Sequence, residues 1–296
     1  MKIVIAFGGN SISNPSKKES VKERISRIEN VVKSLRPLSD KHEIIITHGN
    51  GSDVGNLLIQ QEKSKNEVYP LPLDTLDAMT QGQLGYWLQR TVNNLWYKKA
   101  VSVITTVIVD KNDHAFENPT KPIGPFYKEK ISAGMVFIDG KGFRKVVPSP
   151  RPIKIVEADT IKKLVDDGYV VIACGGGGIP VIKENNKLVG IEAVVDKDLC
   201  TEILAEEVDA DIILILTDVD KVCLNFGKPN QKKIDKITVK EAERYLKEEQ
   251  FGEGSMKPKI EACIKFLKSG GKEAIICLPE KALDAIEGKA GTIIVR

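Results

Sequence analysis

The sequence predicts an α/β fold in which helices cover both faces of an open, mostly parallel sheet. Short apolar runs rich in Val and Ile recur along the 296 residues, and most are followed by turn residues and then a helical pattern. Because the runs are apolar almost without interruption, we expect strands that are buried on both faces, as in parallel sheets. Strands that alternate with helices are typical of α/β folds.

Seven of these runs are predicted strands. In chain order they span residues 2–7, 43–48, 102–109, 169–174, 211–216, 273–278 and 292–296. The run at 2–7 is too short for a signal peptide and leads directly into glycines, so we interpret it as a strand.

Helical patterns lie between the runs. In residues 158–168 the apolar side chains share one face, and Gly168 ends the pattern as C-terminal glycines do. Residues 258–271 show the same arrangement, with Gly270 at the exit.

The longest helical pattern, residues 73–96, contains Gly82 and Gly85. A glycine in a helix interior costs roughly 1 kcal/mol relative to Ala. We therefore expect another backbone to approach this helix closely, either from within the chain or from a dimer partner.

One segment, residues 113–149, breaks the alternation of strands and helices. It is rich in Pro and Gly and has no long helical period. Residues 135–147 indicate a hairpin with Asp139 and Gly140 at the turn. We predict a small subdomain at 113–149 that protrudes from a single domain spanning residues 1–296. The alternating apolar residues argue against a disordered linker.

Composition excludes several classes of protein. With 42% hydrophobic and 29% charged residues, the chain is ordinary for a soluble globular protein. A formal net charge of +3 is too mild to indicate a nucleic-acid partner. The apolar runs are too short to span a membrane. The five cysteines form no CxxC pair, which argues against a disulfide framework and favours a reducing, cytoplasmic location.

Three predicted strands end in loops that have almost no side chains. These loops are Gly8-Gly9-Asn10, Gly49-Asn50-Gly51 and the run Gly175, Gly176, Gly177 and Gly178. In a parallel sheet such loops meet at the carboxyl edge, where open α/β folds bind ligands. A helix is predicted after the second loop, and its N-terminus offers free N–H groups to an anion. We predict a phosphate-binding floor at this edge.

The four consecutive glycines call for a specific reason, because glycine costs extra backbone entropy on folding. A sharp exit from the strand explains one or two of them. We expect the loop to leave room for a substrate between the phosphate-binding loops and Lys197.

Two lysines stand where helices are predicted to begin. Lys197 is followed by Asp198, and Lys259 follows Pro258, a residue suited to a first helical turn. A cation at this end of a helix is unfavourable by a few tenths to about 1 kcal/mol. Two such lysines, in a chain with three glycine loops, indicate an anion between them. Phosphoryl transfer requires this combination of positioning and charge neutralisation.

Familiar signatures of other sites are absent from the sequence. There is no Walker A motif, no GxGxxG after a strand and no GxSxG. His48, beside the second glycine loop, is expected to be structural. Because no nucleophile and base are paired, direct transfer is favoured over a covalent intermediate. Thr217, Asp218 and Asp220 end another strand and could orient a lysine, hold Mg²⁺, bond a ribose or form a simple turn.

With these residues assembled, the sequence resembles the carbamate kinases of the amino acid kinase family almost from end to end. The resemblance rests on strings in the family's order: AFGGN, THGNG, PLDTLDAMTQGQLGYWL, FENPTKPIGPFY, IACGGGGIPV, VVDKDL and LTDVD. It implies an eight-stranded sheet, a homodimer and reversible phosphoryl transfer between ATP and carbamate. It further implies that ADP and carbamoyl phosphate are on the other side of the reaction, and that Mg²⁺ is required and is carried by the nucleotide rather than by the protein.

The resemblance also implies roles for matching residues. The first two glycine loops would hold the transferred phosphoryl group and the carbamate. Lys197, oriented by Asp198, and Lys259 would stabilise the charge of the transition state, and Lys121 would reach the substrate from the protruding subdomain. The nucleotide site would contain Thr217, Asp218 and Met256.

The sequence departs from the family pattern at a few positions. Ser52 and Asp53 stand where Pro and Gln are usual, and Asp53 adds a negative charge beside the phosphate floor. Cys223 replaces a frequent Tyr near the expected nucleotide site. Because every candidate catalytic lysine is present, we expect activity.

Several functions remain open at the level of sequence. The main expectation is formation of ATP from carbamoyl phosphate and ADP. The same site could instead synthesise carbamoyl phosphate for arginine or pyrimidine pathways. A nucleotide or metabolite sensor with the same fold, or a kinase for another small acid, are further alternatives.

Overall fold

The computed structural model describes residues 1–13, 19–130, 134–138, 140, 142–252 and 256–296. Its centre is an eight-stranded sheet in the order β15-β17-β16-β12-β1-β2-β9-β3. Every neighbouring pair runs parallel except β16 and β17. The strands are β1 (Lys2–Phe7), β2 (Glu43–His48), β3 (Ala100–Ser102), β9 (Val170–Ile172), β12 (Ile212–Leu216), β15 (Lys236–Thr238), β16 (Glu273–Cys277) and β17 (Thr292–Val295). The predicted α/β fold class is confirmed.

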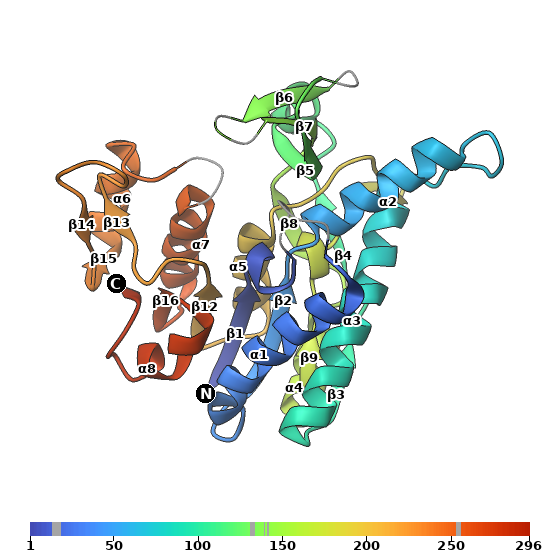
Figure 1. Ribbon diagram of the computed structural model, residues 1–296. Coiled ribbons are helices and arrows are strands. Elements are labelled where there is room, and N and C mark those ends of the chain that lie inside the picture. Colours follow the sequence, from blue (N-terminus) through green and yellow to red (C-terminus); the bar gives the residue numbers. More distant parts are fainter. Residues whose placement is uncertain (14–18, 131–133, 139, 141, 253–255) are drawn as a thin grey trace.

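Helices cover both faces of this sheet (Figure 1). One layer contains α1 (Val21–Ser39), α3 (Leu73–Trp96) and α8 (Ala282–Ile286). The other contains α4 (Ala158–Asp166), α5 (Lys197–Glu207), α6 (Val239–Lys247) and α7 (Met256–Ser269). Successive side chains of a strand point to opposite faces. Along β1, Ile3 and Ile5 therefore pack in the first layer and Val4 and Ala6 in the second. This two-sided burial explains the continuous apolar runs.

The predicted strand at 102–109 is wrong in its extent. The chain instead forms β3, leaves the central sheet, and forms β4 (Thr106–Val109) in a second sheet of order β11-β10-β4-β8. The side chain of Gln81 occupies the break: its Oε1 accepts from the Thr105 N–H at 2.8 Å, and its Nε2 donates to the Thr105 carbonyl at 3.1 Å. Both strands contain buried residues, so the apolar pattern runs on across the break.

The other strands of the second sheet are β8 (Pro152–Ile155), β10 (Ile179–Glu184) and β11 (Lys187–Gly190). A short ribbon pairs β13 (Cys223–Leu224) with β14 (Lys232–Lys233). A third sheet is antiparallel, in the order β5-β7-β6, and consists of β5 (Lys121–Tyr127), β6 (Met135–Ile138) and β7 (Gly142–Val147).

The β5-β7-β6 sheet stands out from the body of the molecule at the top of Figure 1. It packs on α2 (Gly51–Ser64), where a Cβ on Gly55 would lie only 2.0 Å from the Cα of Gly124. Of the expected hairpin turn, Asp139 lies outside the described residues. The boundaries 113–149 and the single domain over 1–296 stay predictions.

The two glycines of α3 have different surroundings. Gly85 is buried, and a Cβ there would lie 2.1 Å from Ser102 Oγ, so the close approach comes from a side chain of the chain's own β3 rather than from the expected backbone. Gly82 is exposed and has open space around it. Neither α3 nor any other helix in the described ranges is long and apolar enough to cross a membrane.

Candidate active site

The three glycine loops meet at one edge of the central sheet, because β1, β2 and β9 are consecutive neighbours that run parallel. They border a cavity of about 180 Å³, called here the inner cavity. The predicted loop residues that line it are Gly9, Gly49, Asn50, Gly51 and Gly176. Exposed backbone at the carboxyl ends of strands suits an anion.

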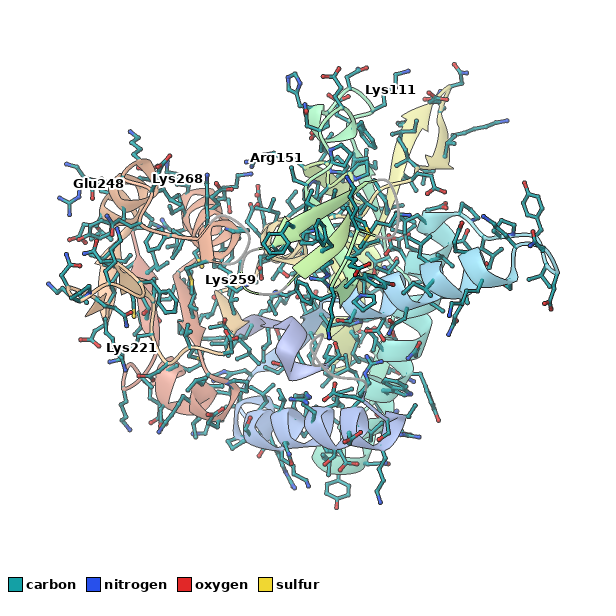
Figure 2. The ribbon with its side chains drawn as sticks, turned by 45° about the horizontal axis from the view of Figure 1, so that its top comes forward. Lys111, Arg151, Lys221, Glu248, Lys259 and Lys268 are labelled. Carbon is teal, nitrogen blue, oxygen red and sulfur yellow. The ribbon has the colours of Figure 1, made fainter. Side chains whose placement is uncertain are left out.

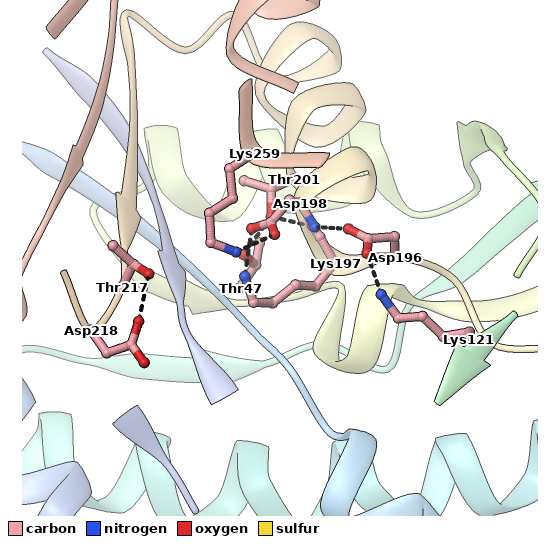
Figure 3. A network of polar contacts seen from close by, with 9 residues as sticks. All are labelled: Thr47, Lys121, Asp196, Lys197, Asp198, Thr201, Thr217, Asp218 and Lys259. Carbon is pink, nitrogen blue, oxygen red and sulfur yellow. Dashed lines mark hydrogen bonds and ion pairs between the residues drawn. The ribbon is translucent and has the colours of Figure 1, made fainter. Parts of the chain in front are cut away.

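A buried carboxylate holds two lysines beside this cavity (Figure 3). Asp198 Oδ1 lies 2.5 Å from Lys197 Nζ, and Asp198 Oδ2 lies 2.8 Å from Lys259 Nζ. The side chains of Lys197, Asp198 and Lys259 are 11%, 5% and 13% exposed. Two cations on one carboxylate leave positive charge directed at the cavity.

The pKa directions in this cluster follow from burial and charge. Burial alone would raise the pKa of the Asp198 carboxyl, but Lys197 and Lys259 hold it well below its usual range. Burial lowers the pKa of Lys197 despite its partner. Burial also opposes the charge on Lys259, but the Asp198 carboxylate outweighs it and raises that pKa. Asp198 is therefore a fixed negative charge rather than a proton acceptor.

A third lysine reaches the inner cavity from the protruding sheet. Lys121, at the start of β5, forms an ion pair with Asp196 Oδ2, and both residues line the cavity. Asp196 is also the N-cap of α5, since its Oδ1 accepts from the Asp198 N–H at 2.9 Å. Figure 3 shows Lys121 pointing from β5 towards this carboxylate.

Asn50 is held in place by α3. Its Nδ2 donates to Asp77 Oδ1 at 2.9 Å and to Thr80 Oγ1 at 2.8 Å. Burial raises the pKa of Asp77 well above its ordinary value. Asp77 Oδ2 is buried and has no hydrogen-bond partner within the described part of the chain. With both amide protons engaged, the orientation of the Asn50 side chain is set.

The four consecutive glycines answer only in part to the predicted reason. A Cβ on Gly176 (φ +70°) would lie 2.2 Å from Asn50 Nδ2, and one on Gly177 would lie 2.3 Å from the Val195 carbonyl oxygen. The loop is thus packed tightly against protein atoms, and only Gly176 of the four lines the cavity. Gly176 borders the cavity with the second glycine loop and Lys197, as predicted, whereas Gly175, Gly177 and Gly178 allow the loop to pack closely against neighbouring protein groups.

His48 lies under this loop and is structural in character. A Cβ on Gly175 would lie 2.5 Å from His48 Nε2. Burial, reinforced by Lys197, lowers the pKa of His48 to about 4 although its bond to the Gly49 carbonyl opposes this. The imidazole is therefore neutral at neutral pH.

A second cavity of about 350 Å³, the outer cavity, opens beside the first. The predicted nucleotide residues Thr217, Asp218 and Met256 line it, together with Lys259. Lys259 lines both cavities. In Figure 2 this lysine lies between the C-terminal part of the chain and the rest of the molecule, whereas Lys111 lies at the upper edge of the view. Two cavities that meet at one cation allow a group to pass from one bound molecule to another.

Comparison with known proteins agrees with this geometry. The family model of the amino acid kinase family matches residues 1–277. Carbamate kinases of Thermococcus kodakarensis and Clostridium perfringens are each 46% identical, with the alignment covering 100% of this chain and 99% and 100% of theirs. The chain belongs to the amino acid kinase family.

A solved structure extends this match to three dimensions. The carbamate kinase of Giardia lamblia bound to AMP-PNP is 36% identical, covers 99% of this chain and 98% of its own, and has a TM-score of 0.91. The same enzyme bound to citric acid has a TM-score of 0.94. Along its whole length the chain is thus a member of the carbamate kinases, a group of nucleotide-using phosphotransferases.

Some predicted residues of this family pattern do not reach the inner cavity. Gly8 packs against β12, where a Cβ would lie 2.7 Å from the Leu216 carbonyl oxygen. Gly175 and Gly177 are not among the residues that line this cavity. Asn10 follows Gly9 in a short 3₁₀ helix, and its side chain is outside the described structure.

Sequence reasoning missed other residues of the site. Asp196 and Asp77 contact predicted site residues directly. The VVDKDL string held a signal for Asp196, because an Asp directly before a helix is a preferred N-cap. No local pattern marks Asp77, which meets Asn50 only through the packing of α2 against α3.

The departure at Asp53 has a local explanation. Asp53 Oδ1 lies 2.6 Å from Arg24 Nη1, and their side chains are 4% and 11% exposed. The Arg24 guanidinium in turn lies 5.0 Å from the ring centroid of Trp87. The expected extra negative charge at the phosphate floor is therefore paired with a cation from α1, and Asp53 does not line the inner cavity.

In the part of the chain that the structure describes, the residues around the cavities do not form an evident metal centre. Among the described residues no group of three or more His, Cys, Asp or Glu side chains could hold a metal ion. Asp196 and Asp198 are both engaged with lysines. This donor set fits a divalent cation that arrives on nucleotide phosphates, since Mg²⁺ in such sites is bound largely by substrate phosphates and water.

Proposed function

We propose that this chain catalyses reversible phosphoryl transfer between ATP and carbamate, and works mainly towards ATP from carbamoyl phosphate and ADP. The observation that carries the proposal is the position of Lys259, which lines both cavities. The outer cavity has the size of pockets for drug-sized ligands, about 300–1,000 Å³, and suits a nucleotide. The smaller inner cavity suits carbamate.

The chemistry follows from this arrangement. A carbamate oxygen in the inner cavity forms a bond to the γ-phosphorus, while the bond from phosphorus to the β–γ bridging oxygen breaks and its electron pair leaves with ADP. Lys197 and Lys259 neutralise the charge on the transferred group. Carbamate is already an oxyanion and needs no base, which agrees with an Asp198 carboxyl whose pKa is held low.

The nucleotide is proposed to bind in the outer cavity. Phe226, Phe251 and Met256 offer apolar contact for a base, while Thr217 and Asp218 offer oxygen atoms for the ribose. Mg²⁺ is proposed to travel with the nucleotide and to screen the charge of its phosphates.

We also propose a homodimer formed through the exposed side of α3. Met79 and Tyr86 on this helix are 43% and 56% exposed, and exposed Gly82 lies between them. Leu188 and Val189 on neighbouring β11 are also exposed. Apolar surface of this kind suits an interface between identical subunits. Light scattering should give twice the chain mass, and Tyr86→Lys should shift it towards the monomer.

The function is tested by mixing the purified protein with carbamoyl phosphate and MgADP and measuring ATP with luciferase. We expect rapid ATP formation by the natural protein, its loss in Lys197→Ala, and unchanged formation in the control Lys111→Ala. Folded protein that binds ADP but forms no ATP would contradict the proposal. In that case a panel of small acids with MgATP would separate another kinase from a sensor.

A further inference from the structure

Asp196 joins two parts of the molecule through one carboxylate. Its Oδ1 accepts the Asp198 N–H at the start of α5, while its Oδ2 pairs with Lys121 Nζ from the protruding sheet. The side chain of Asp196 is 14% exposed and that of Lys121 is 33% exposed. The carboxylate therefore ties the sheet to the helix that carries Lys197.

This tie has a geometric consequence. The N-cap bond fixes Asp196 to the first turn of α5, which also contains Lys197 and Asp198. The ion pair then fixes Lys121 relative to that turn (Figure 3). A lysine side chain is flexible and loses rotamer entropy when it is immobilised. A partner that orders it before the substrate arrives removes that cost from the reaction.

We propose that Asp196 is a positioning residue for the transfer, which holds Lys121 over the inner cavity at a set distance from the Lys197–Asp198–Lys259 cluster. This inference rests on the proposed function. Lys121 contributes the charge that meets the substrate, and Asp196 decides where that charge lies.

The net charge of the inner cavity predicts different effects of Asp196 on substrate binding and on phosphoryl transfer. The ammonium groups of Lys121, Lys197 and Lys259 face the carboxylates of Asp196 and Asp198, so one positive charge is unbalanced. Removing the charge of Asp196 makes the cavity more positive. Binding of anionic carbamoyl phosphate should then not weaken, whereas transfer should slow because Lys121 is no longer held.

The test substitution is Asp196→Asn, because Asn caps helices as well as Asp and keeps the Oδ1 acceptor. The matched control is Asp113→Asn. Asp113 also uses both oxygens, accepting from the Ala115 N–H at 2.8 Å and the Arg151 N–H at 2.9 Å, and it does not line the inner cavity. Each substitution removes one charge from a residue that caps a helix.

We expect Asp196→Asn to lower kcat for ATP formation about tenfold or more, without raising KM for carbamoyl phosphate. Asp113→Asn should stay within about twofold of the natural protein. Adding Asp196→Asn to Lys121→Met should cause no further loss, because the lysine to be positioned is gone. Losses that multiply in the double variant, or an Asp196→Asn variant no slower than Asp113→Asn, would overturn the inference.

A second measurement does not depend on activity. Reductive methylation of the ligand-free protein, followed by mass spectrometry, compares the labelling rate of Lys121 with that of Lys111. Asp196→Asn should raise the rate at Lys121 several-fold and leave Lys111 unchanged; equal rates in both proteins would show that Asp196 does not hold Lys121. If the natural protein forms no ATP, the proposed function fails, and this labelling still decides whether the tie exists.

Discussion

The inner and outer cavities share Lys259 but are built in different ways. The inner cavity is bordered by backbone at the ends of neighbouring strands, and each of its charged side chains takes part in an ion pair. The outer cavity is lined in large part by apolar side chains, among them Phe226, which is 70% exposed, and Phe251, which is 6% exposed. The inner cavity is distinguished by its paired charges and the outer cavity by its aromatic side chains.

The difference indicates how each cavity responds to substitution. Preorganised charge stabilises a transition state only when its geometry is kept, so small displacements in the inner cavity should slow transfer strongly. Apolar area contributes to affinity in small increments, so changes in the outer cavity should alter nucleotide affinity modestly. The following predictions test this contrast.

Lys259 is the point at which the two cavities meet, and its loss should have the largest effect. Lys259→Met should lower kcat/KM about 10²- to 10³-fold, because a cation aimed at the transferred group is removed while Lys197 still pairs with Asp198. The control is Lys268→Met on the same helix, whose exposed lysine pairs with Glu243. Steady-state kinetics in the ATP-forming direction measure the ratio, and a loss below tenfold would contradict the role of Lys259.

The substitution Gly176→Ala tests how tightly the glycine loop packs against Asn50 at the inner cavity. The new Cβ would meet Asn50 in a backbone with φ +70°, so we expect a loss of about 1–3 kcal/mol in the free energy of unfolding, together with slower transfer. Gly227→Ala is the matched control: φ there is +76°, and nothing lies within 4 Å of the Cβ. Urea unfolding of both variants separates the clash from backbone strain. Equal losses would refute the tight fit at Asn50.

Arg24 and Asp53 form a buried ion pair, in which Asp53 lies two residues after the loop Gly49-Asn50-Gly51. Arg24→Met leaves the Asp53 carboxylate buried without its partner and should cost about 3 kcal/mol of unfolding free energy. Adding Asp53→Asn should recover most of that loss, because no buried charge then lacks a partner. Thermal unfolding measures both variants, and a double variant no more stable than Arg24→Met would count against a coupled pair.

The contact between α5 and α7, the helices that carry Lys197 and Lys259, contains a pH-sensitive group. Burial raises the pKa of Glu202 from 4.5 to about 7 in the folded protein. The folded state therefore binds more protons than the unfolded state between about pH 4.5 and 7, and stability falls as the pH rises through this window.

Glu202→Gln should remove this part of the pH dependence. We expect the variant to match the natural protein at pH 4.5 and to exceed it by about 1–2 kcal/mol at pH 8.5, where the natural carboxyl is ionised. Urea unfolding at both pH values is the measurement. A variant that is less stable at pH 8.5 would show that the ionised carboxylate is well accommodated.

The outer cavity should show the smallest effect. Cys223→Tyr adds an aromatic ring to its lining, and such contacts contribute about 0.5–1.5 kcal/mol. We expect KM for ADP to fall about threefold while kcat stays within twofold. A large fall in kcat would mean that the outer cavity is as sensitive to geometry as the inner one, and the contrast between them would not hold.

The amino-acid pattern alone predicts the main strands of the central sheet and the edge at which their loops meet. Apolar runs marked β1, β2, β9 and β12, because burial on both faces demands continuous apolar residues. Glycines after these runs predicted the position of the phosphate-binding site, because the loops that follow parallel strands come together at one edge of the sheet. Lys197 and Lys259 stood out because a cation at a helix start is locally unfavourable.

Which groups pair with one another depends on the packing of the folded chain. Asp77 with Asn50, Arg24 with Asp53, and Lys121 with Asp196 are contacts between distant segments, and no local pattern encodes them. The break between β3 and β4 was hidden for a related reason, because both strands contain buried residues and the apolar pattern does not change where one sheet ends. A local sequence pattern shows where a side chain is unfavourable in its own helix or loop. The packing of distant segments determines which residue pairs with that side chain and offsets the unfavourable energy.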